Sequence, residues 1–190
     1  MENTQSDTQL RHSKIDLMTK SVFLSTICLS LKHEFSEVIP TAATNGLSIL
    51  YNPDFLNGLS PAERTGLLAH EVWHVAFSHL TRVGTRDKMI WNKAGDYVIN
   101  YMLTAAGFTI PKGGLYDERF REMSTEEVYE IIKEEPDDSH GGSDFEVDLQ
   151  TRLIMGIGGT LMTGWTLLLI WALSRPIERR VVILLTAFPV

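Results

Sequence analysis

Five consecutive residues, His70-Glu71-Val72-Trp73-His74, carry the clearest chemical signal in the sequence. On an α-helix, positions i and i+4 lie on the same face, so both imidazoles can offer a nitrogen to one metal ion. The surrounding stretch of residues 65–80 is apolar nearly all round, which predicts a buried helix. Burying two imidazoles and a carboxylate is unfavourable unless something compensates for the lost water. A bound metal ion would compensate all three groups.

This spacing predicts catalytic chemistry because a catalytic zinc ion takes three protein ligands and keeps one position for water. His70 and His74 are the first two expected ligands, and Glu71 between them is the expected general base for the metal-activated water. A third ligand must come from elsewhere in the chain. A histidine six residues after the second one would define the metzincin class, but Leu80 stands there, and Phe77 replaces the required glycine.

Asp96 is the favoured third ligand. It lies in a polar stripe, Asn92, Asp96 and Asn100, on an otherwise apolar helical stretch. Such a stripe either faces water or faces the histidine helix, and the second interpretation closes the metal site. Asp117 and Glu118 remain alternatives. On a continuous helix His79 lies about 140° around from His74, so it is predicted to pack in the core or to support a ligand from behind, and not to bind the metal itself.

The elements that must position these residues are readable from local signals. Apolar spacing predicts a long helix from about 14 to 35, and Asn45-Gly46 predicts a hairpin between two short strands within 38–51. Ser60, Pro61 and Glu63 form a capping box that begins the histidine helix, which is expected to run to about Thr81. Further helices are expected at 88–105 and, after a second capping box at Ser124, to about 133. Residues 107–114 are expected to form a loop.

Several of these blocks together resemble a known family. The blocks are Leu50-Tyr-Asn-Pro, the run from Leu68 to Leu80, Trp91-Asn-Lys-Ala-Gly-Asp-Tyr-Val-Ile-Asn and Ser124-Thr-Glu-Glu-Val-Tyr. They look like the metallopeptidase domain of bacterial and phage proteins that usually precedes a von Willebrand factor A-like domain. The resemblance implies an α+β, zincin-like fold, mainly helical, with a small hairpin or sheet beside the histidine helix. It also implies one Zn²⁺ ion held by His70, His74 and Asp96, with Glu71 as catalytic base.

In a zincin-like fold the strand 47–51 is expected to form the sheet edge beside the metal. An extended peptide or protein substrate would then pair with it, which makes Ser48 and Leu50 candidate substrate-binding residues. Zinc would polarise the scissile carbonyl, and Glu71 would move the water's proton to the leaving amine. Tyr97 and Tyr101 are candidates for stabilising the oxyanion. The competing hypotheses are a zincin-fold module that binds metal or peptide without turnover, and a truncated fragment without activity.

Composition narrows the class of protein. The chain has 190 residues, a net charge of −7 and an isoelectric point near 5.3, which argues against nucleic acid as a partner. Its one cysteine, Cys28, excludes an intramolecular disulfide framework and is expected to be a packed core residue. The N-terminus lacks the pattern of a signal peptide, so the catalytic domain is expected to be cytoplasmic and not secreted.

The predicted domain organisation has four parts. A disordered N-terminus (1–13) precedes the metallopeptidase domain (14–133), an acidic linker (134–152) and a hydrophobic tail (153–190). Residues 153–173 carry no charge and are long enough to cross a bilayer, which predicts a C-terminal hydrophobic helix. Three interpretations stay open for it: a transmembrane anchor, an out-of-frame or truncation product, and a core helix.

Overall fold

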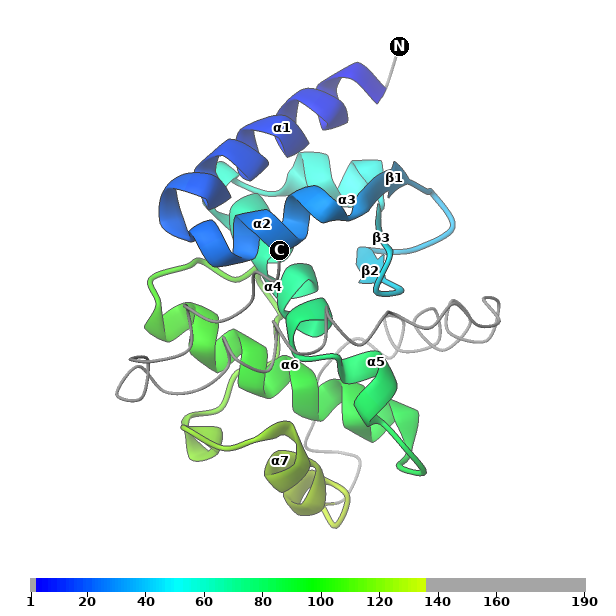
Figure 1. The fold of residues 1–190 in the computed structure, drawn as a ribbon, viewed down its shortest axis with the longest axis vertical. Coiled ribbons are helices and arrows are strands. Elements are labelled where there is room, and N and C mark those ends of the chain that lie inside the picture. Colours follow the sequence, from blue (N-terminus) through cyan, green and yellow to red (C-terminus); the bar gives the residue numbers. More distant parts are fainter. Residues whose placement is uncertain (1–2, 136–190) are drawn as a thin grey trace, which may run out of the picture. The chain divides into compact units, whose positions relative to one another are not determined.

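The structure, a computed structural model, describes residues 3–135 (Figure 1). They form an α+β arrangement that is mostly helical, with a small three-stranded sheet, as the sequence predicts. The acidic linker from residue 136 onward and the hydrophobic tail of residues 153–190 lie outside the described residues. In chain order the elements are α1 (Asn3–Lys20), α2 (Val22–Ser30), β1 (Lys32–Phe35), β2 (Ala42–Thr44), β3 (Ser48–Tyr51), α3 (Pro53–Gly58), α4 (Pro61–Ala76), α5 (His79–Arg82), α6 (Lys88–Ala105), the 3₁₀ helix η1 (Glu118–Phe120) and α7 (Thr125–Ile132).

The N-terminal region differs from its prediction. Residues 1–13 were expected to be disordered, but α1 begins at Asn3 and buries Leu10 and Leu17 in the core that it shares with α4. The expected single helix over 14–35 is also wrong. Ser21 interrupts it by capping α2, where its Oγ accepts a hydrogen bond from the Leu24 amide. Side chains of this kind compete with the helix for backbone hydrogen bonds, so apolar spacing alone did not reveal the break.

The sheet has the order β1-β3-β2. The predicted hairpin is confirmed: β2 pairs antiparallel with β3, and Gly46 in the turn has φ +85°. The end of the expected first helix instead forms β1, which pairs parallel with β3 from Lys32 opposite Ser48 to Phe35 opposite Tyr51. The prediction that strand 47–51 is a sheet edge is therefore wrong, because β3 lies between two partners. Among the described strands the edges are β1 and β2.

Helix α4 is the central element. It contacts α1, α2 and β2, and it also contacts α6 (Figure 1). Its predicted capping box is confirmed, since Ser60 Oγ accepts from the Glu63 amide at 3.3 Å and the Ser60 amide donates to Glu63 Oε2 at 2.9 Å. Gly66 lets α4 lie against the segment after α6, because a Cβ there would stand 1.9 Å from the carbonyl oxygen of Thr109. These contacts hold α4 against α1, α2, β2 and α6.

The second half of the core lies beyond α6. Helix α6 has the predicted bounds, residues 107–114 form the predicted loop, and α7 begins at the predicted capping box of Ser124. Helix α6 contacts both η1 and α7. This half is built around the buried residues Trp91, Ala94, Tyr97, Val98, Phe120, Val128, Tyr129 and Ile132.

Within residues 3–135, no helix is long and apolar enough to cross a membrane. The predicted membrane-spanning segment, 153–173, falls outside that range.

Candidate metal centre

The three predicted ligands meet between α4 and α6. His70 Nε2 and His74 Nε2 are 3.0 Å apart, and Asp96 Oδ1 lies 3.3 Å from the first and 3.0 Å from the second. The His74 side chain is 2% exposed, and the side chains of His70 and Asp96 are each 13% exposed. The polar stripe of α6 therefore faces the histidine helix and not water. His70, His74 and Asp96 thus form a cluster in which each residue offers one ligand atom, and these atoms all lie within 4.8 Å of one another.

The state of Asp96 supports a cation within this cluster. Its Oδ1 is buried and accepts no hydrogen bond of acceptable geometry, although both imidazoles are close. A buried carboxylate oxygen without a hydrogen donor is costly unless a charge compensates it. Two nitrogens and one carboxylate oxygen are a donor set that fits a catalytic zinc ion.

The hydrogen-bond network assigns the proton of His70. Asn100 Nδ2 donates to the Leu115 carbonyl at 2.9 Å, which turns Asn100 Oδ1 toward His70 Nδ1, 2.9 Å away. An amide oxygen only accepts, so His70 Nδ1 carries the hydrogen and its Nε2 keeps a lone pair. A hydrogen bond at the other ring nitrogen is the usual way in which a protein orients a histidine that binds metal. Asn100 lies four residues after Asp96, in the stripe that the sequence displayed, but its partner was not foreseen.

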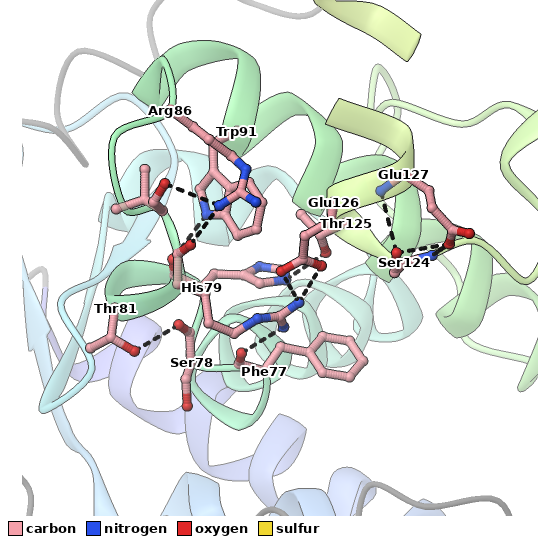
Figure 2. Close-up of polar contacts among 12 residues, drawn as sticks. Phe77, Ser78, His79, Thr81, Arg86, Trp91, Ser124, Thr125, Glu126 and Glu127 are labelled. Atoms are coloured by element: carbon pink, nitrogen blue, oxygen red, sulfur yellow. Dashed lines mark hydrogen bonds and ion pairs between the residues drawn. The ribbon is translucent and has the colours of Figure 1, made fainter. Parts of the chain in front are cut away.

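Another histidine, His79, contacts the Nδ1 side of the His74 ring. His79 Nδ1 lies 3.1 Å from His74 Nδ1. On its other side, His79 Nε2 lies 3.0 Å from Thr125 Oγ1 on α7, and Figure 2 shows these two residues. Burial lowers the pKa of His74. Burial, together with the neighbouring His74 and Arg82, lowers the pKa of His79 to about 2. Both rings are therefore neutral at pH 7, which is the form that a histidine needs to bind metal.

The prediction for His79 was correct in its result but wrong in its geometry. The side chain is 3% exposed and does not belong to the three-ligand cluster, as expected for a packed histidine. However, α4 does not continue to Thr81. It ends at Ala76, Ser78 takes the left-handed conformation with φ +54°, and α5 begins at His79. This reversal turns the His79 ring toward His74, which the angle on a continuous helix excluded.

Glu71, the expected general base, lies on α4 between the two histidines. It is 1% exposed. Burial raises the pKa of the Tyr51 hydroxyl, and the nearby Glu71 carboxylate raises it further. A carboxylate in such a poorly solvated position interacts strongly with nearby protons and charges.

The remaining candidates make other contacts. Tyr97 is 7% exposed and packs edge-on against Phe120 with 4.8 Å between ring centroids, while the ring of Tyr101 stacks on Tyr116. Asp117 caps η1 and pairs with Arg119, and Glu118 is exposed, so the alternative third ligands do not join the histidines.

Comparison with known families agrees with this cluster. A family model described as "Putative metallopeptidase domain" matches residues 5–153. The chain belongs to this family. The match confirms the resemblance found in the sequence, and it extends from the first turn of α1 through α7. No curated protein and no solved structure shows significant similarity to the chain. Membership in a metallopeptidase family implies a metal-dependent hydrolase, and the His70, His74 and Asp96 cluster is where a metal could be held.

Proposed function

We propose that this member of the metallopeptidase family is a zinc-dependent peptidase with a zincin-like active site. In this proposal His70, His74 and Asp96 hold one zinc ion and Glu71 is the general base. The observation that carries it is the convergence of Nε2, Nε2 and Oδ1 within 3.3 Å of one another. Three protein ligands leave one position for water, as catalytic zinc sites require.

The residues around the ion have separate tasks. Bound zinc would polarise the scissile carbonyl and make the attacking water more acidic. Asn100 keeps the His70 Nε2 lone pair directed at the site. Glu71 accepts the proton of the attacking water and returns it to the leaving amine. Burial of Glu71 favours this transfer, because few competing waters surround the carboxylate.

An extended peptide is the proposed substrate, in keeping with the description of the family. Ser48 and Leu50 lie on β3, whose two sides are already paired, so in the proposal they do not bind the substrate main chain. The residues of β2 are each 2% exposed or less, which closes that edge of the sheet to an added strand.

The test compares Glu71→Gln with the wild-type full chain. Wild type should bind one zinc per chain and cleave members of a peptide library, with loss of cleavage on chelation. Glu71→Gln should keep the zinc and lose cleavage. The control Glu118→Gln changes an exposed carboxylate and should keep both properties. Wild-type protein that binds zinc and cleaves no peptide would instead support a binding module, and full activity in Glu71→Gln would refute the assigned base.

A further inference from the structure

A hydrogen-bonded relay connects the metal cluster to α7. It consists of His74, His79 and Thr125, joined by contacts of 3.1 and 3.0 Å. His74, His79 and Thr125 are each 3% exposed or less. Water therefore cannot easily replace a missing member of the relay, and each ring nitrogen depends on its neighbour in the chain.

Several separate features of the fold position the His79 ring within the relay. The left-handed Ser78 turns His79 inward, and Trp91 Nε1 holds its backbone by donating to the His79 carbonyl at 2.9 Å (Figure 2). Gly95 leaves room for the ring, because a Cβ there would stand 2.8 Å from His79 Nδ1. A ring packed and bonded on all sides holds its orientation, which is what a residue needs in order to orient another.

The protons of the relay can follow two orders. In the first, Thr125 donates to His79 Nε2, His79 Nδ1–H donates to His74 Nδ1, and His74 carries its hydrogen on Nε2. That order leaves His74 no lone pair for a metal. In the second, His74 Nδ1–H donates to His79 Nδ1, and His79 Nε2–H donates to Thr125 Oγ1. Only the second order leaves the His74 Nε2 lone pair free to bind.

We propose that His79 and Thr125 are positioning residues that select the metal-binding tautomer of His74, so that the docking of α7 tunes metal affinity. This inference rests on the proposed metal site. Thr125 is the last acceptor of the relay. Without its hydroxyl, the order that binds metal buries the His79 Nε2–H without a partner, while the metal-free protein can place that proton elsewhere. The loss therefore falls on metal binding.

Contacts from α5 and from the start of α6 hold α7 close to His79. Arg82 Nη2 on α5 contacts both carboxylate oxygens of Glu126 at 2.7 and 2.5 Å, and Arg82 Nη1 donates to the Phe77 carbonyl at 2.9 Å. The Asp87 amide donates to the Tyr129 hydroxyl at 3.0 Å. These contacts hold α7 beside α5 and the start of α6, with Thr125 against His79. Because coupling between binding and docking is reciprocal, metal binding should also stabilise the docked α7.

The test measures zinc affinity by competition with a chromophoric chelator in the full chain. Thr125→Val keeps the branched shape and removes the hydroxyl, and it should weaken zinc binding about 10–100-fold. Thr125→Ser restores a hydroxyl and should recover most of the affinity. Thr81→Val is the matched control, because its hydroxyl bonds only the Ser78 carbonyl, and it should bind as wild type does.

A spectroscopic signature separates positioning from a general effect on packing. In zinc-loaded wild type, ¹⁵N-resolved NMR of the histidine rings should place hydrogens on His74 Nδ1 and His79 Nε2. A hydrogen on His79 Nδ1 would overturn the proposal, as would a Thr125→Val variant that binds zinc like wild type. In both of those outcomes wild type still binds zinc and the proposed peptidase stands. A wild-type chain that binds no zinc would instead refute the proposed metal site itself.

Discussion

Replacing Gly95 with alanine should destabilise the protein, although the same change in an open helix is stabilising. Alanine in a helix interior is better than glycine by about 1 kcal/mol. Here the new Cβ would stand 2.8 Å from Nδ1 and 2.9 Å from Cε1 of His79, closer than real contacts allow. The ring cannot retreat freely, because its nitrogens contact His74 at 3.1 Å and Thr125 at 3.0 Å.

The sizes of the separate contributions show whether Gly95→Ala raises or lowers the free energy of unfolding. Overpacking a core site costs about 1–3 kcal/mol, and losing one relay hydrogen bond costs about 1 kcal/mol more. After subtracting the helix gain, the free energy of unfolding of Gly95→Ala should fall by about 1–3 kcal/mol. Urea unfolding of the metal-free full chain measures this difference, with equal m-values as evidence that the denatured state is unchanged.

Gly58 provides the matched control. It ends α3, and a Cβ there would meet nothing within 4 Å. Gly58→Ala should therefore be neutral or stabilising by up to about 1 kcal/mol. If Gly95→Ala were as stable as Gly58→Ala, the tight approach of His79 to α6 would be wrong, and the argument for a fixed His79 ring would fail with it.

Three further predictions follow from other contacts. Asn100→Ala removes the acceptor of His70 Nδ1 and should weaken zinc binding about 10–100-fold, measured by chelator competition, whereas an unchanged affinity would mean that Asn100 does not set the tautomer. Ser60→Ala breaks the capping box of α4 and should lower the free energy of unfolding by about 1 kcal/mol in urea; no change would show that the cap contributes little. The metal-free protein should lose stability as pH falls below about 6.5. In the unfolded chain His74 and His79 bind protons below that pH, whereas in the folded protein their pKa values are lowered, that of His79 to about 2, so the folded rings stay neutral. Each such proton contributes a slope of about 1.4 kcal/mol per pH unit, and a flat unfolding free energy between pH 7 and 5 would refute the buried neutral rings.

The sequence predicted those parts of the fold that local chemistry determines. The capping boxes at Ser60 and Ser124 and the Asn45-Gly46 turn are where they were expected, because each depends on residues within a few positions. Strand β1 was missed because it exists through its parallel pairing with β3, and no signal within residues 32–35 reports a distant partner. The same pairing places β3 in the middle of the sheet, so the strand that was expected to be an edge is not one.

The candidate site likewise has some features that local sequence spacing predicts and others that depend on the tertiary fold. Helical spacing brought His70 and His74 together, and the stripe on α6 indicated Asp96, because both patterns repeat every four residues. The relay was not predictable in this way. It depends on Ser78 in a left-handed conformation without glycine, and on Thr125, which comes from a helix 46 residues away in sequence from His79. The role of Asn100 could be suspected from its place in the stripe, but only the tertiary fold shows which ring it contacts.

The most direct test of the central claim is an anomalous diffraction map, at the zinc edge, of crystals of the zinc-loaded protein. One peak per chain is predicted, bonded to His70 Nε2, His74 Nε2 and the Asp96 carboxylate at about 2.0–2.2 Å, with a further position open to water. A map with no peak there, or one in which Glu71 or His79 binds the ion in place of Asp96, would contradict the account.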